Sequence, residues 1–103
     1  MITISNEEIE ELFNEAILIF EEILKEDKDN IKAIEDIGAC YGKLGDNKKA
    51  LEKFNEALVL ANSKNDNESI IDISINKISS LFKLKDYNQI INFSKETIDK
   101  VNI

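Results

Sequence analysis

Proline is absent from this 103-residue chain, and glycine occurs only three times. Because proline and glycine are the strongest breakers of helices, their scarcity predicts long helices joined by short turns. Apolar residues also recur at the 3.6-residue spacing of a helix, as at Ile9, Phe13, Ile17 and Phe20. The chain is therefore expected to be all-α, with about five helices and no strands.

Capping residues and apolar faces locate these helices. Ser5 and Glu8 have the spacing of a capping box, and Gly45 suits the left-handed conformation that ends a helix. Asp46 and Asp86 are placed to cap the helices that follow them. The helices are expected at about 6–26, 30–44, 47–63, 68–84 and 87–101, with a polar connector over 62–67.

The charge of the chain excludes several functions. The net charge is −8, and neither histidine nor arginine occurs. Histidine catalysis and histidine-ligated metals are therefore excluded, and nucleic acids and anionic membranes are disfavoured as partners. The acidic clusters lack the glycine and distal glutamate of a calcium loop, and no nucleophile–base pair or phosphate loop is evident. We expect no enzyme, no metal and no cofactor.

The sequence predicts a cytoplasmic protein. Its N-terminus has neither the basic region nor the apolar stretch of a secretory signal, and no apolar run approaches the ~18 residues of a membrane helix. Cys40 is the single cysteine, so an intrachain disulfide is impossible, and it is expected to be a small packing residue.

Apolar residues also repeat at longer intervals, which is typical of helical repeat proteins. Intervals of 34 and 40 residues both occur. The first separates Ala16 from Ala50 and Phe20 from Phe54, and the second separates Leu51 from Ile91, Leu58 from Ile98 and Asp46 from Asp86.

Residues 31–64 resemble one complete tetratricopeptide repeat. The resemblance is carried by Ile37-Gly38 at the family's Leu-Gly, and by Tyr41, Ala50, Phe54 and Ala57 at its Tyr, Ala, Phe and second Ala. The sequence departs from the family at Ile34, where Trp is usual, and at Asn62, where Pro is usual. Small residues suit the places where paired helices approach closely, and large ones fill the gap between them.

The resemblance implies one domain over 1–103, a tetratricopeptide-like α-solenoid of roughly two and a half repeats. Residues 6–30 resemble only the second helix of a repeat, so the helix that would precede it is missing. Residues 65–101 resemble a longer, divergent repeat in which Lys85 replaces the turn glycine and Ser94 replaces the phenylalanine.

In this family the first helices of successive repeats line a concave groove that holds extended peptides or partner helices. The resemblance therefore implies a scaffold that binds a protein or peptide. The implied groove residues are Lys32, Glu35, Ala39, Gly42, Lys43, Ser79 and Phe82.

The register of the helix over 68–84 is open. A shift of forty residues from the preceding repeat places Ser74, Lys77, Ile78 and Leu81 inward and leaves Ile75 and Phe82 in the groove. A shift of 41 residues places Ile75, Ile78 and Phe82 inward and buries no lysine. The second register is preferred because burying an unpaired charge costs free energy.

The first helix carries most of the negative charge. Residues 1–30 hold ten acidic side chains against two lysines, whereas the charges of 31–103 balance. The acidic face, which includes Glu11, Glu15 and Glu22, either keeps the chain soluble or attracts a basic partner. The alternative function is self-assembly, in which the apolar side left uncovered on a terminal helix forms a homo-oligomer.

Overall fold

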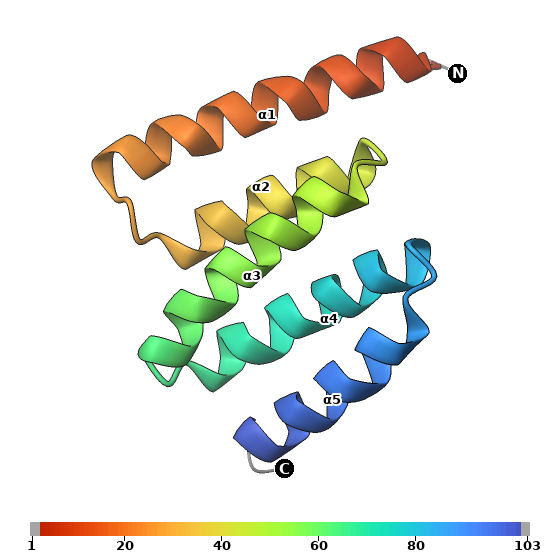
Figure 1. Cartoon of the computed structure of the whole chain (residues 1–103). Coiled ribbons are helices and arrows are strands. Elements are labelled where there is room, and N and C mark those ends of the chain that lie inside the picture. Colours follow the sequence, from red (N-terminus) through yellow and green to blue (C-terminus); the bar gives the residue numbers. More distant parts are fainter. Residues whose placement is uncertain (1–2, 102–103) are drawn as a thin grey trace.

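The computed structural model describes residues 3–101, which form five helices stacked in the order of the sequence (Figure 1). The helices are α1 (Asn6–Glu26), α2 (Ile31–Lys43), α3 (Asn47–Ser63), α4 (Asn67–Lys83) and α5 (Tyr87–Val101). No strand occurs over 3–101, which confirms the all-α prediction. None of these helices has a stretch long and apolar enough to span a lipid bilayer.

Each helix packs against its neighbours in sequence, and the one further contact is between α2 and α4. No other pair of the described helices brings Cα atoms within 8 Å. The radius of gyration is 14.7 Å, against about 13 Å for a compact domain of 100 residues. The fold is thus an elongated stack in which contacts are local in sequence, as in a helical repeat.

Three nearly identical turns join the last four helices. Each turn has a residue of positive φ followed by an aspartate, and the residues of positive φ are Gly45 (84°), Asn65 (51°) and Lys85 (61°). The aspartate amide donates back across the turn, as from Asp46 to the carbonyl of Tyr41 at 2.9 Å. This is the Schellman geometry, and here it recurs every twenty residues.

The predicted connector over 62–67 is too long. The turn occupies only residues 64–66, because α3 continues to Ser63 and α4 begins at Asn67. Asn65 tolerates the left-handed conformation, and Asp66 accepts a hydrogen bond from the amide of Ser69 at 3.1 Å. The polar run therefore encodes a tight turn and a cap.

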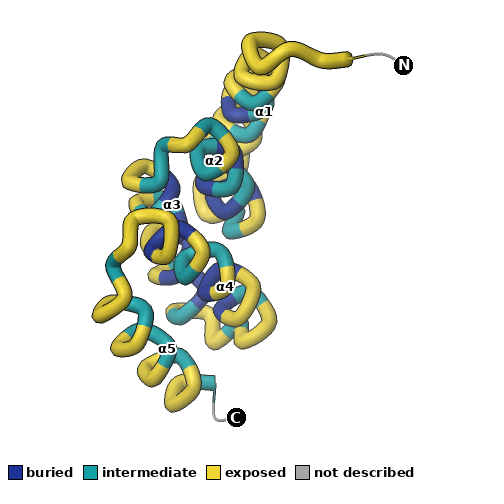
Figure 2. The backbone as a smooth tube through the Cα atoms, turned by 90° about the vertical axis from the view of Figure 1, so that its right-hand side faces the viewer, coloured by how far each residue is buried: buried dark blue, intermediate teal, exposed yellow. Residues whose placement is uncertain are grey.

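The largest part of the core lies between α2, α3 and α4 (Figure 2). Helical periodicity places six residues on the inner face of α3, and the structure buries five of them, Ala50, Phe54, Ala57, Leu58 and Ala61, whereas Leu51 stays partly exposed. A Cβ atom on Gly38 would lie 2.7 Å from the ring of Phe54. The predicted close approach of α2 and α3 at Gly38 is confirmed.

The preferred register of α4 is wrong. Ser74 and Leu81 are buried, whereas Ile75 and Phe82 are each 62% exposed. The shift of forty residues is therefore the one adopted. Lys77 lies partly inside the fold, and its ammonium group sits 4.1 Å from the centroid of the Phe93 ring.

The lysine is accommodated because its aliphatic stem can pack against apolar surface while its charge meets an aromatic face. Burial lowers the pKa of Lys77, and the nearby carboxylate of Glu96 acts against that shift. Lys77 is therefore not the unpaired charge expected from the sequence, because α5 supplies Phe93 as its partner.

Candidate peptide-binding groove

A shallow depression of about 110 Å³ lies between α2 and α4. Its lining residues come from both helices and from α3 beneath them, and they are Ala39, Gly42, Lys43, Phe54, Asn76, Ser79, Ser80 and Lys83. Four of the residues predicted for the groove, Ala39, Gly42, Lys43 and Ser79, therefore meet at one place. We call this depression the α2–α4 groove.

Small side chains keep the α2–α4 groove open. A Cβ atom added to Gly42 would meet no atom within 4 Å. Ala39 and Ser79 are equally small residues of the facing helices, and they occupy equivalent positions forty residues apart. Phe54 is only 2% exposed and closes the floor from α3. The space thus follows from residue size along two neighbouring helices.

One end of the groove is basic. Lys43 and Lys83 both line it, and each belongs to the last turn of its helix. Cations are favoured there because the carboxyl end of a helix carries partial negative charge. A ligand bound between them would meet two ammonium groups.

At the other end of the groove, a buried carboxylate connects α2 to α4. Glu35 is 5% exposed, and Nδ2 of Asn76 donates to its Oε2 at 2.8 Å. Nζ of Lys32 lies 3.7 Å from Oε1 of Glu35 and 3.3 Å from Oδ1 of Asp36. The sequence predicts Glu35 in the groove, but its carboxylate already interacts with Asn76 and Lys32 of the same chain.

Burial raises the pKa of Glu35, and Asp36 and Asp72 add to the effect. Lys32 and the hydrogen bond from Asn76 act in the opposite direction. The same proximity raises the pKa of Lys32, mainly through Glu35. This arrangement links α2 to α4 and leaves Lys32 itself largely exposed.

Phe82 lies outside the α2–α4 groove. Its side chain is exposed and meets the ring of Tyr87 edge to face, with centroids 5.8 Å apart and ring planes at 70°. The pair joins the end of α4 to the start of α5. Of the seven predicted groove residues, Lys32, Glu35 and Phe82 do not line the groove.

The predicted acidic face is exposed along α1. Glu11, Glu15 and Glu22 are all accessible, and Glu22 pairs with Lys25 at 2.7 Å. No group of His, Cys, Asp and Glu side chains that could hold a metal ion occurs among residues 3–101. Cys40 is buried, and burial raises the pKa of its thiol.

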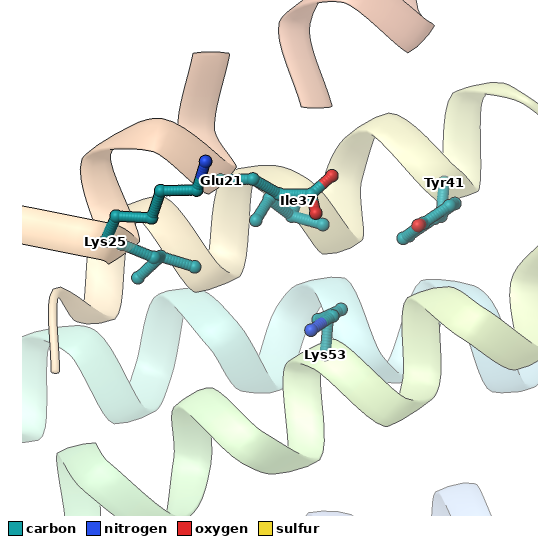
Figure 3. Close-up of a pocket in the computed structure, with 6 residues that line it drawn as sticks. Glu21, Lys25, Ile37, Tyr41 and Lys53 are labelled. Carbon is teal, nitrogen blue, oxygen red and sulfur yellow. The ribbon is translucent and has the colours of Figure 1, made fainter. Parts of the chain in front are cut away.

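A second depression of about 340 Å³ opens beside α1, α2 and α3 (Figure 3). Its lining is a mixture of apolar and charged residues, namely Glu21, Leu24, Lys25, Ile37, Tyr41 and Lys53. It was not predicted from the sequence, because it forms between α1 and α3, whose Cα atoms do not approach within 8 Å of each other. Only the packing of both helices on α2 brings these side chains together.

The sequence matches no known protein family, and no curated protein is significantly similar to it.

Proposed function

We propose that this chain is a tetratricopeptide-like α-solenoid that binds an extended peptide segment of another protein in the α2–α4 groove. The observation that carries the proposal is the convergence of Ala39, Gly42 and Ser79 on one open depression beside two lysines. An extended strand fits such a groove because it can present side chains to a shallow pocket and hydrogen-bonding groups to polar neighbours.

The repeat interpretation is supported by matched packing in the two helix pairs. Gly38 of α2 contacts Phe54 of α3, and the residues forty positions later are Ile78 of α4 and Ser94 of α5. Ile78 and Ser94 line one depression between those helices. The large and small residues have changed sides, so each pair sets one bulky residue opposite a small one.

The groove chemistry favours a particular kind of peptide. The space above Gly42 admits one side chain, and Lys43 and Lys83 favour an acidic group next to it. Ser79 and Ser80 offer hydroxyl groups that both donate and accept hydrogen bonds. We expect selected ligands to carry Asp, Glu or a free carboxylate near one end.

The test is a selection from a random peptide library displayed on phage, followed by calorimetric titration of synthetic peptides. Ala39→Tyr should fill the groove and weaken binding by about tenfold or more, because bulk replaces the pocket that holds the ligand. Amide resonances of Ala39, Gly42 and Ser79 should shift on titration of the wild-type chain.

The matched control is Val59→Tyr, because Val59 is 69% exposed on α3 and does not line the groove. This variant should bind as the wild type does. Binding that survives Ala39→Tyr, or resonance shifts confined to α1, would contradict the proposal. Circular dichroism of both variants establishes that the fold is retained.

A further inference from the structure

One face of α1 remains uncovered although it is apolar. Ile9, Leu12, Ile19 and Ile23 are 38%, 56%, 62% and 39% exposed. Together with Ala16, which is partly covered by the core between α1 and α2, they recur at alternating intervals of three and four residues along the 21-residue helix. This is the a/d spacing that buries a seam against a second helix. We call these five residues the α1 seam.

The same positions are covered in α3. The 34-residue interval relates Ala16, Ile19 and Ile23 to Ala50, Lys53 and Ala57. Ala50 and Ala57 have no exposed surface, and Lys53 packs close to Gly38 of α2. This face of the repeated helix is thus one that the fold itself covers with another helix. In α1, which contacts only α2 among the described helices, that cover is missing (Figure 1).

The border of the α1 seam is acidic. Glu8, Glu15 and Glu22 each precede a seam residue by one position, which makes them the g positions of the same heptads. The row on the other side is Phe13 and Phe20, which pack toward α2. The solvent edge of the seam is therefore a line of carboxylates.

A second acidic group borders the space beside the seam. Asp36 lies one turn before Cys40, which packs in the core between α1 and α2. Tyr41 lines the depression of Figure 3. An ideal helix turns by 100° per residue, so Asp36 points about 140° away from Tyr41 around the axis of α2. Asp36 thus faces away from that depression, toward the side on which the seam lies.

These charges distinguish between possible occupants. Two copies of α1 packed seam to seam and antiparallel would bring their rows of glutamate together, which is unfavourable, and two parallel copies would set each row beside Phe13 and Phe20 of the other copy. A helix with lysine or arginine beside its apolar stripe would instead place its cations against this edge, first at Glu15, because Glu8 already accepts from Ser5 and Asp36 pairs with Lys32. We propose that the α1 seam binds a basic amphipathic helix of a partner protein, at a surface separate from the α2–α4 groove.

The test uses two synthetic 21-residue peptides that match the length of α1. Both carry leucine at the a and d positions, and one has lysine at e and g where the other has glutamate. Like charges on both edges keep each peptide from pairing with itself. Fluorescence anisotropy should show that the wild-type chain binds the lysine peptide, with affinity that falls as salt is added, and binds the glutamate peptide at least about tenfold more weakly.

Two variants separate the seam from its charged edge. Ile19→Asp should weaken the binding of the lysine peptide by about tenfold or more, because it places a charge in the centre of the apolar contact. Glu15→Lys combined with Glu22→Lys should narrow or reverse the difference in affinity between the two peptides, and it leaves the capping box of Ser5 and Glu8 intact. Val59→Asp, an equally exposed apolar position on α3, is the control and should change neither affinity. Ala39→Tyr should also leave both unchanged, which separates this inference from the α2–α4 groove.

Sedimentation of the chain alone completes the test. A concentration-dependent dimer that Ile19→Asp abolishes would show that a second copy covers the seam, and it would overturn the proposal. Equal binding of the two peptides, no binding of either, or equal loss in Ile19→Asp and Val59→Asp would overturn it as well.

Discussion

The helices α3 and α5 differ in burial although they are similar in length. The α3 helix has 17 residues and buries five of them, whereas α5 has 15 residues and buries none. Leu58 of α3 is 7% exposed, and Ile98, forty residues later, is 53% exposed. The two helices begin after the same kind of turn, so their local structure does not explain the difference.

The difference follows from the number of neighbours. The backbone of α3 packs closely on both α2 and α4, whereas within residues 3–101 the backbone of α5 comes within 8 Å, between Cα atoms, of α4 alone. In a linear stack, each interface contributes separately to the free energy of folding, and an end helix has one interface fewer. An apolar depression of about 250 Å³ remains between α4 and α5, lined in part by Ile71, Ile75 and Ile98.

The largest expected effect tests this comparison at one pair of positions. Leu58→Ala should destabilise the fold by about 2–4 kcal/mol, because it leaves a cavity between α3 and its neighbours. Ile98→Ala should cost less than about 1 kcal/mol, because half of its surface is already in water. Urea denaturation of both variants measures the difference, and equal losses would show that α5 is covered in solution.

Gly38→Ala tests the close contact between α2 and α3. The new Cβ atom would lie 2.7 Å from a buried aromatic ring, so we expect a loss of about 1–2 kcal/mol. Gly42→Ala is the control in the same helix, where the Cβ atom meets nothing within 4 Å. There alanine should raise the free energy of unfolding by about 0.5–1 kcal/mol, because it restricts the unfolded chain. A higher melting temperature for Gly38→Ala than for Gly42→Ala would contradict the close contact of Gly38 with Phe54.

Lys85→Gly sharpens the comparison of the three turns. Lys85 has a φ of 61°, which a side chain with a Cβ atom adopts at a cost, so glycine should stabilise the fold by up to about 1 kcal/mol. Asn65→Gly should gain less, because asparagine tolerates this conformation better than lysine does. A lower denaturation midpoint for Lys85→Gly would show that the lysine side chain stabilises the fold by more than the strain of its positive φ costs.

The sequence predicts the helices and the inner face of α3 well, because caps and helical periodicity are local signals. It also predicts Ala39, Gly42 and Lys43 as neighbours, because they follow from one repeat, whereas Ser79 joins them through the forty-residue register that was not preferred. The register of α4 was missed because it depends on the contact of Lys77 with Phe93, which only tertiary packing reveals. The burial of Glu35 was missed for the same reason, since Asn76 is 41 residues away.

The smallest expected effect concerns Glu35, whose equivalent in α4 is the exposed Ile75. Because burial raises the pKa of Glu35 above its ordinary value of 4.5, the folded chain holds a proton on this carboxyl more tightly than the unfolded chain does. The group therefore contributes stability below pH 4.5, and the contribution is lost as the pH rises through the higher folded-state pKa.

Glu35→Gln keeps a neutral side chain at every pH and can still accept the hydrogen bond from Asn76. The variant should be more stable than the wild type at neutral pH, by less than about 1 kcal/mol, because solvent and Lys32 offset much of the cost of the charge. The difference should vanish below pH 4.5, where the wild-type carboxyl is protonated in both states. Urea denaturation across this range measures it, with Glu52→Gln on the exposed side of α3 as the control for the change in net charge. A wild type more stable than the variant at neutral pH would mean that the ion pair of Glu35 with Lys32 within α2 outweighs the cost of burying the charge.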